Sequence, residues 1–198
     1  MKSESAWHFD GDLKQALVTA ARLIVETEGA AALSLRALAR ATGVSAMAPY
    51  HHFKDRAALV AAVAAAGFDQ LYSDKIAALA AAPGDPAQRI VAGSIAYVRF
   101  VVDHPELYRL MKSPELSDRA AHPDLAAAAA RPGASLYAML LDLAAADRLH
   151  GVSPIVAGEI MWAMVHGIGT LSIDAYLAEP EALASAGAAA LLAGWGAL

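Results

Sequence analysis

The chain has 198 residues, no cysteine and a formal net charge of −5 at pH 7. This length accommodates one domain, or a small domain joined to a larger one. The lack of cysteine excludes disulfides and thiolate metal sites and fits a cytoplasmic protein. We expect no membrane-spanning helix, because no run of about 18 bulky apolar residues is free of charge. We expect no signal peptide, because the N-terminal residues include acids and lack an apolar core.

The charge is unevenly distributed along the chain. Residues 1–60 carry seven Lys or Arg against six Asp or Glu, whereas residues 61–198 carry eight against fourteen. Attraction to a phosphate acts over about one Debye length, roughly 8–10 Å, so a local basic face matters more than the total charge. The slight basic excess of the first part is a weak indication of DNA binding, and the residue pattern has to decide.

The pattern of apolar residues predicts an all-α fold. Apolar residues recur at spacings of three and four, and no β-branched run alternates with polar residues. Ser, Asp, Pro and Gly mark the expected helix ends, and Pro132 predicts a kink or a new start inside one helix. The expected helices cover about 11–28, 35–42, 46–53, 55–82, 86–102, 104–112, 122–149, 153–178 and 180–195.

The segment from Ser34 to Arg56 reads SLRALARATGVSAMAPYHHFKDR and carries the clearest functional signal. Two short helices are joined through Gly43, which can adopt the left-handed conformation of a sharp turn, and Ser45 is expected to cap the second helix. This is the layout of a helix-turn-helix, whose second helix enters the DNA major groove by its N-terminal end.

The same layout predicts which side chains contact DNA. Residues at the start of the second helix would face base edges, and the flanking polar residues would lie near phosphates, with Ser34 and the free amides at its helix start forming an anion site. Pro49 removes an amide donor, so we expect a tight or irregular first turn. Few side chains there can form hydrogen bonds, which favours thymine methyl contacts and DNA shape as the source of specificity. The predicted contacts are Ser34, Arg36, Ser45, Ala46, Met47, Ala48, Tyr50, His51, His52, Lys54 and Arg56.

The segment resembles the tetracycline-repressor (TetR) family. The resemblance is carried by Glu28-Gly29, LSLRALARATGVS, Tyr50-His51-His52-Phe53 and Lys54-Asp55-Arg56. The opening Trp7-His8-Phe9-Asp10-Gly11-Asp12-Leu13, the run HPELYRLM, and Trp162, His166 and Gly167 resemble a subgroup named for a Trp-His-Gly motif. Met47 stands where the family usually has a small residue, and Arg56 stands where Lys is common.

The resemblance implies an N-terminal three-helix DNA-binding domain at 1–55 and a larger helical ligand-sensing and dimerisation domain at 56–198. It implies a cytoplasmic, ligand-responsive transcriptional regulator without a cofactor, most often a repressor that a small molecule releases from a palindromic operator. No nucleophile, base and acid constellation supports an enzyme. The alternative is a helical small-molecule-binding or scaffold protein with a non-functional helix-turn-helix, which the low basic charge and the bland Ala46–Pro49 face leave open.

An effector cavity in the C-terminal domain would be built from aromatic and apolar residues with a few polar groups. Such residues at helical spacing are more often core, and His166, four residues after Trp162, could equally be a hydrogen-bonded histidine beneath an interface. The candidate pocket residues are Tyr97, Phe100, Val101, His104, Tyr108, Met111, Tyr137, Trp162 and His166. An apolar effector is compatible with the composition.

Two further expectations concern metals and assembly. The seven histidines are scattered and include no His-x-x-x-His pair, which predicts no metal site. The last two long helices are rich in Ala, Gly and Leu, which predicts a homodimer joined by a four-helix interface. The alternative is that these faces only form internal core.

Overall fold

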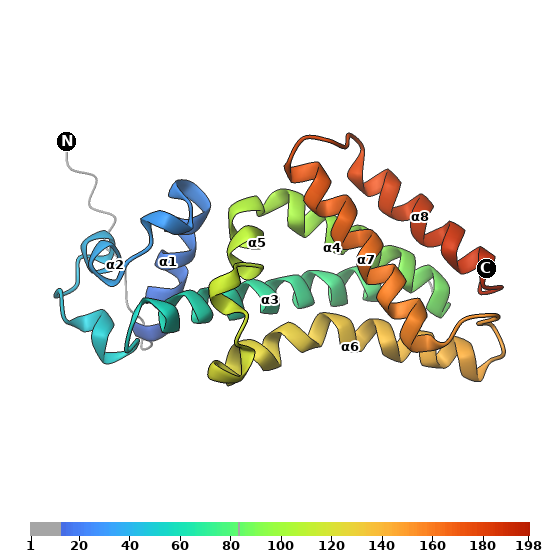
Figure 1. The fold of residues 1–198 in the computed structure, drawn as a ribbon, viewed down its shortest axis with the longest axis horizontal. Coiled ribbons are helices and arrows are strands. Elements are labelled where there is room, and N and C mark those ends of the chain that lie inside the picture. Colours follow the sequence, from blue (N-terminus) through green and yellow to red (C-terminus); the bar gives the residue numbers. More distant parts are fainter. Residues whose placement is uncertain (1–12, 83) are drawn as a thin grey trace. The chain divides into compact units, whose positions relative to one another are not determined.

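The computed structural model describes residues 13–82 and 84–198, so the aromatic opening at 7–12 lies outside the described residues. Every regular element of the described residues is a helix, which confirms the all-α prediction. Figure 1 shows the eight α-helices labelled in chain order. They are α1 (Leu13–Glu28), α2 (Leu35–Thr42), α3 (Arg56–Ala81), α4 (Pro86–Asp103), α5 (Pro105–Met111), α6 (Pro123–Ala145), α7 (Pro154–Ile173) and α8 (Pro180–Gly194).

The chain forms two compact units. Unit 1 contains the described residues up to Gly67 together with Pro105–Ala128, and unit 2 contains Phe68–His104 and Ala129–Leu198. This division differs from a single cut between residues 55 and 56, because the segment from α5 to the start of α6 packs within unit 1. Helix α3 is continuous and contributes residues to both units.

The helix ends in unit 1 follow the capping signals of the sequence. The Ser34 hydroxyl accepts a hydrogen bond from the Ala37 amide at 3.1 Å, and the Asp55 carboxylate accepts one from the Ala58 amide at 2.8 Å. Gly43 ends α2 in the left-handed conformation with φ 71°. These contacts confirm the predicted starts of α2 and α3, and they satisfy backbone amides that a helix start leaves free.

Unit 1 is held together by one apolar core. Helix α1 packs against α2 and α5, and α5 also approaches α3 at Gly67, where an added Cβ would lie 2.7 Å from the Met111 sulfur. A glycine therefore allows this close helix contact without a shift of the Met111 side chain. The fully buried large side chains of the unit include Leu17, Leu33, Leu38, Leu59, Leu107, Leu110, Met111, Leu116 and Leu125.

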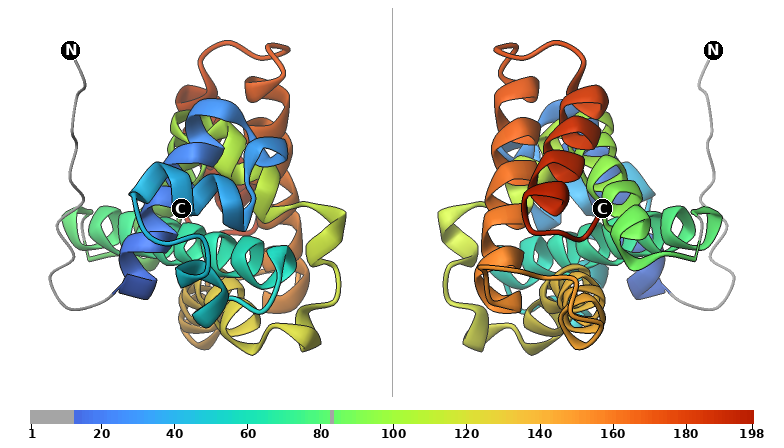
Figure 2. Two further views of the ribbon diagram at one scale, coloured as in Figure 1. Left: turned by 90° about the vertical axis from the view of Figure 1, so that its left-hand side faces the viewer. Right: turned by 90° about the vertical axis from the view of Figure 1, so that its right-hand side faces the viewer.

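Unit 2 is built around α4, α7 and α8, which lie side by side in Figure 1 and in the two further views of Figure 2. Gly169 of α7 lets that helix approach α4, because an added Cβ would meet Val101 at 2.9 Å. Arg148 holds the loop before α7 by hydrogen bonds to the Asp85 carboxylate at 2.6 Å and the Ala197 carbonyl at 2.5 Å. The core of the unit comprises Ala87, Ile90, Met139, Leu140, Leu143, Ala157, Met161, Ala188, Leu192 and Ala197.

Two C-terminal helices end earlier than predicted, and one continues where a break was possible. Helix α6 ends at Ala145 because Asp147 adopts a left-handed φ of 54° and the Arg148 amide turns back to the Leu143 carbonyl at 2.8 Å. Helix α7 ends at Ile173, two residues before Ala175 with φ 62°. Helix α6 runs through Pro132 as one element, which excludes the new start, one of the two alternatives expected from that proline.

Helix α7 is apolar enough to need an explanation. Among the described helices, α7 alone has the length and composition of a membrane span, with a mean hydropathy of 1.3. Only 28% of that stretch is buried within the chain. Length and composition alone are weak evidence for a membrane span, because packed helices of water-soluble proteins share them, so the exposed apolar face of α7 has to be considered as a contact surface.

Candidate functional site

The segment after the Gly43 turn is shorter and tighter than the helix predicted at 46–53. It forms a single 3₁₀ turn at Ala48–His51. Pro49 has no amide hydrogen, so it cannot donate to the carbonyl four residues earlier, and the Tyr50 amide bonds to the Met47 carbonyl at 3.1 Å instead. The predicted α-helix was therefore wrong, whereas the tight first turn expected from Pro49 is confirmed. We call residues 46–54 the recognition turn.

Ser45 does not cap this turn with its side chain. The residue before the 3₁₀ turn is Met47, which forms no side-chain cap, and Ser45 contributes its carbonyl, which accepts from the Ala48 amide at 3.0 Å. The predicted Ser45 cap was wrong because the turn begins two residues later than expected. The exposed Ser45 hydroxyl remains on the surface of unit 1.

The recognition turn presents most of its predicted contact residues to solvent. Met47 is 61% exposed and Tyr50 is 41% exposed, while Pro49 and Phe53 are buried beneath them. The buried pair anchors the turn on unit 1 and fixes the direction of its outer face. The predicted residues that are exposed are Arg36, Ser45, Ala46, Met47, Tyr50, His51, His52 and Lys54, and those that are half-buried are Ser34, Ala48 and Arg56.

Arg56 is held by unit 1 itself. Its guanidinium donates to the Leu33 carbonyl at 3.0 Å, the Ala30 carbonyl at 2.9 Å and the Glu115 carboxylate at 2.6 Å. These acceptors lie before α2 and after α5, so one side chain ties together three segments of unit 1. Glu115 had no role in the sequence analysis, because it lies 59 residues from Arg56 and no local pattern connects them.

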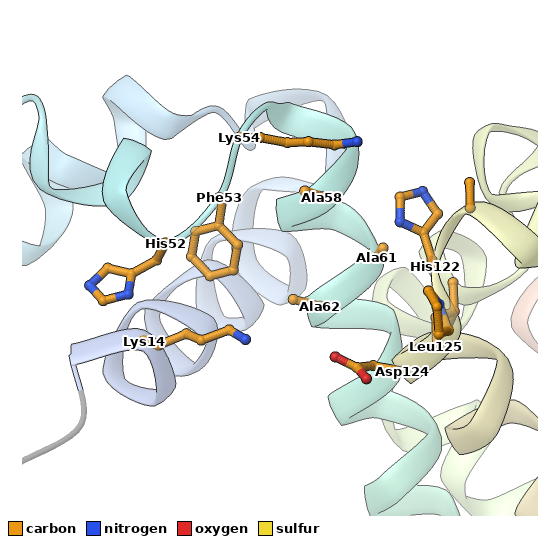
Figure 3. A pocket seen from close by; sticks show the side chains of 12 residues that line it. Lys14, His52, Phe53, Lys54, Ala58, Ala61, Ala62, His122, Asp124 and Leu125 are labelled. Carbon is orange, nitrogen blue, oxygen red and sulfur yellow. The ribbon is translucent and has the colours of Figure 1, made fainter.

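A pocket of about 250 Å³ lies beside the recognition turn within unit 1. Figure 3 shows the Lys14 amine and the Asp124 carboxylate pointing toward one another across Ala62, with Lys54 and His122 at the other side. Its charged lining consists of two lysines, Lys14 and Lys54, and one carboxylate, Asp124, which gives the pocket a small positive excess. Lys54, the last residue of the recognition turn, thus also lines this pocket.

Unit 2 has an open groove of about 400 Å³ between α3 and α4. Its apolar surface includes Ala77, Ala78, Ala96 and Phe100, and charged or polar residues at 74, 99, 103 and 104 complete the lining. Two of the predicted pocket residues, Phe100 and His104, line this groove, and their rings lie 5.1 Å apart.

The other predicted pocket residues are distributed over both units. Tyr97 and Val101 are buried in unit 2, whereas Tyr108 and Met111 are buried in unit 1. Tyr137 packs against Gly158 of α7, so its ring fills the space between α6 and α7. None of these five lines the groove of unit 2.

Trp162 and His166 form a stacked pair on the surface of α7. Their ring centroids lie 5.3 Å apart with an interplanar angle of 22°, and Trp162 is 50% exposed. A half-exposed tryptophan on an apolar helix is typical of a surface that binds another protein. Within the described residues no group of three or more His, Asp or Glu side chains is placed to hold a metal ion.

Sequence reasoning also missed Lys75, although a signal was present. Lys75 lies between Leu71 and Leu79 in the apolar stripe of α3 and is only 7% exposed. Burial lowers the pKa of its amine from 10.5 to about 8. A lysine within an apolar stripe at helical spacing is the pattern that could have identified it.

Two family models match the chain. Residues 16–63 match a model described as bacterial regulatory proteins of the tetR family, and residues 90–193 match one described as a tetracyclin repressor-like C-terminal domain. The second model alone covers more than half of the 198 residues. The narrower Trp-His-Gly subgroup remains a prediction.

Solved structures have the same fold, whereas no curated protein matches. A protein of unknown function from Rhodococcus sp. RHA1 is 30% identical, with 98% of this chain and 100% of that chain covered and a TM-score of 0.86. The regulator PfmR from Thermus thermophilus is 20% identical, with 89% and 97% covered and a TM-score of 0.69. The protein RolR, solved in complex with resorcinol, is 21% identical, with 92% and 87% covered and a TM-score of 0.63.

Regulators of the tetR family bind operator DNA and small-molecule effectors, act as homodimers in the cytoplasm, and are generally not enzymes. The exposed recognition turn and the matches to both family models agree with that description. The chain therefore belongs to the tetR family of bacterial regulatory proteins and is a DNA-binding transcriptional regulator that responds to a ligand.

Proposed function

We propose that the chain is a cytoplasmic repressor that binds a palindromic operator as a homodimer and releases it when a small molecule binds unit 2. The observation that carries the DNA-binding part is the recognition turn, where buried Pro49 and Phe53 fix an outer face containing Met47, Tyr50 and His51. A rigid anchor with exposed side chains is what base contacts in a groove require.

The contacts divide by chemistry. Met47 is more exposed than Tyr50, and it carries no hydrogen-bonding group, so it would contact a thymine methyl. His51 would reach a base edge, and Tyr50, His52 and Lys54 would lie along the phosphates. Arg36, Ser34 and the free amides at the start of α2 would hold a further phosphate through the helix dipole. Arg56 would act mainly by holding unit 1 together, since three of its five N–H donors bond to Leu33, Ala30 and Glu115.

The proposed dimer surface is the apolar face of α7 with the adjoining part of α8. Exposed apolar residues lie along the outer half of α7, and together they form a broad apolar stripe. The members of this stripe are Ile155, Val156, Ile160, Trp162 and Leu171, joined by Leu183 of α8. A second copy packed on the same stripe would form a four-helix interface, and a twofold dimer is what an operator with two half-sites about 34 Å apart requires.

The effector is proposed to bind in unit 2, the part that matches the repressor-like C-terminal model over most of its length. The groove lined by Phe100 and His104 offers an apolar surface with polar groups at its rim. Tyr97 and Val101 are buried on α4 in the same unit, whereas Tyr137 packs between α6 and α7, outside the groove. The RolR structure holds resorcinol, which makes a small molecule of that size a reasonable first ligand to test.

The test is a fluorescence-anisotropy titration of the purified chain against the DNA that flanks its own gene, at two salt concentrations. Nanomolar, salt-dependent binding to one short palindrome is expected, because phosphate contacts release counterions. The variant Met47→Ala tests the proposed base contact, because it removes that contact and no charge. It should reduce discrimination between operator variants and leave the salt dependence of binding unchanged. Weak binding that is equal for every sequence would instead support the alternative, a helical binding protein with a non-functional helix-turn-helix.

A further inference from the structure

Lys75 is a buried cation inside unit 2. It lies on α3 with only 7% of its surface exposed, and Gly93 of α4 closes over its stem, since a Cβ added there would lie 3.1 Å from the Lys75 Cε atom. Leu79 borders the same position, 3.0 Å from the added Cβ. The aliphatic stem is therefore packed between α3 and α4, and the amine reaches toward α6.

The amine has one neutral partner. Its Nζ atom donates to the Pro132 carbonyl of α6 at 2.6 Å. An ammonium group has three donors, and among the described residues no carboxylate forms an ion pair with this one. The acids that flank the region have other partners, since Asp69 pairs with Arg131 and Asp74 accepts from Gln70 at 2.6 Å.

A buried ammonium group without a counter-ion destabilises the ligand-free chain. A buried charge costs several kcal/mol unless an opposite charge and hydrogen bonds compensate for it. Burial already lowers the pKa of Lys75 to about 8, which still leaves the amine protonated at pH 7. The ligand-sensing unit thus holds a desolvated positive charge without a counter-ion.

The α6 segment that faces this amine carries small side chains. Ala129, Ala130, Gly133 and Ala134 surround Pro132 in the sequence, and Arg131 is directed to Asp69. Pro132 itself has no amide hydrogen, so the helix is locally short of one backbone bond. An acidic group that entered beside Pro132 would meet the Lys75 amine and no competing cation of that segment.

We propose that the effector of this regulator is an organic acid whose carboxylate pairs with Lys75. The inference rests on the proposed function, in which a small molecule acts through unit 2, but it places the carboxylate at Lys75 and Pro132 rather than in the groove lined by Phe100 and His104. The carboxylate replaces the Pro132 carbonyl as the partner of the amine, which forms a stronger, charge-assisted hydrogen bond and frees α6 from α3 at this point. Differential affinity of this kind is what shifts a population between two states.

The first measurement compares the thermal stability of the ligand-free wild type with that of Lys75→Met and Arg89→Met. The methionine at 75 fills the same space without a charge, so this variant is expected to melt at the same temperature as the wild type or higher. Arg89 is exposed on α4 in the same unit, and its replacement controls for the loss of one positive charge. A fall of several degrees confined to Lys75→Met would show that the bond to Pro132 holds the fold, and would overturn the inference.

The second measurement uses operator release. Octanoate, benzoate and phenylacetate are compared with octanamide, benzamide and phenylacetamide, which have the same size without the charge. At least one acid should weaken operator binding of the wild type and of Arg89→Met at least tenfold more than its amide does. Lys75→Met should bind the operator normally and lose that difference.

The outcomes separate this inference from the proposed function. Operator binding that responds equally to acids and amides, or to neither class, or that responds to acids equally in Lys75→Met, overturns the acidic effector while the DNA-binding proposal stands. A wild-type chain that binds no operator overturns the proposed function, and the inference falls with it.

Discussion

Replacing Arg56 with lysine separates a structural role from a DNA contact. The guanidinium bonds to the Leu33 and Ala30 carbonyls at 3.0 and 2.9 Å and to the Glu115 carboxylate at 2.6 Å. Lysine keeps the charge but presents it as a point, so it can satisfy one of these acceptors and not the planar set. The family usually has lysine here, so the substitution also restores the common residue.

The expected loss follows from the bonds that lysine cannot make. A hydrogen bond from a charged donor contributes about 1.5–3 kcal/mol when it is shielded. The Arg56 side chain is 40% exposed, and an exposed ion pair contributes only about 0–1 kcal/mol, so the values must be reduced. We expect Arg56→Lys to lower the free energy of unfolding by about 2 kcal/mol, and the melting temperature by roughly 4–8 °C for a chain of this size.

The assay pairs unfolding with operator binding at fixed protein concentration, because dimer stability depends on concentration. Arg56→Lys should reduce stability and leave the slope of log affinity against log salt unchanged. Lys54→Met is the matched control, an exposed basic residue two positions away. It should reduce the salt slope by about 0.9 and change stability by less than about 0.5 kcal/mol.

The opposite pattern would refute this reasoning. If Arg56→Lys unfolds within about 0.5 kcal/mol of the wild type, and Arg56→Met reduces the salt slope by about 0.9, the guanidinium faces phosphate. The bonds to Leu33, Ala30 and Glu115 would then not hold unit 1 together in solution.

Three further predictions follow from unit 2. Trp162→Asp should convert the dimer to a monomer in size-exclusion chromatography with light scattering. The control variant Leu141→Asp, at a comparably exposed apolar position on α6, should remain a dimer. A dimer in both variants would contradict the proposed surface. Burial holds the pKa of Lys75 at about 8, whereas the unfolded value is 10.5, so the folded chain loses this proton at a lower pH than the unfolded chain. Between pH 8 and 10.5 the free energy of unfolding of the wild type should therefore rise by about 3 kcal/mol relative to that of Lys75→Met. A constant difference between the two proteins in a pH series of melts would contradict this. Gly158→Ala places a methyl group into the Tyr137 ring, 2.9 Å from its Cζ atom, and should cost about 1–3 kcal/mol in urea unfolding, which an unchanged midpoint would exclude.

The sequence was sufficient where local chemistry decides the structure. The Ser34 and Asp55 caps and the left-handed Gly43 follow from rules that act within four residues, and all three occur as expected. Pro49 shows the limit of such rules. Its effect on the first turn was foreseen, but the remaining residues to Phe53 did not recover an α-helix. The amides of Tyr50 and His52 bond to carbonyls three residues earlier, and the burial of Pro49 and Phe53 anchors this tighter turn.

The sequence was insufficient where residues distant in the chain meet. The bond between Arg56 and Glu115 spans 59 positions, and the bond between Lys75 and Pro132 spans 57. Helical periodicity predicts which face of an element is buried but not which element covers it. For the same reason the packing of Pro105–Ala128 within unit 1 could not be derived, although the α5 helix itself was expected.

Both of these distant bonds start from α3, which offers a route by which effector binding in unit 2 changes operator binding by unit 1. Arg56 is the first residue of α3 and lies in unit 1, while Lys75 lies in the part of the same continuous helix that belongs to unit 2. A ligand that exchanges the Pro132 partner of Lys75 changes the contacts of α3 in unit 2. The Arg56 network ties the start of α3 to the segments before α2 and after α5 in unit 1. Coupling between two sites is a free energy that can be measured from either one. If α3 carries this coupling, Arg56→Lys should reduce the factor by which the effector weakens operator binding, even though the variant still binds both the effector and the operator. An unchanged factor would mean that the signal does not pass through the Arg56 network.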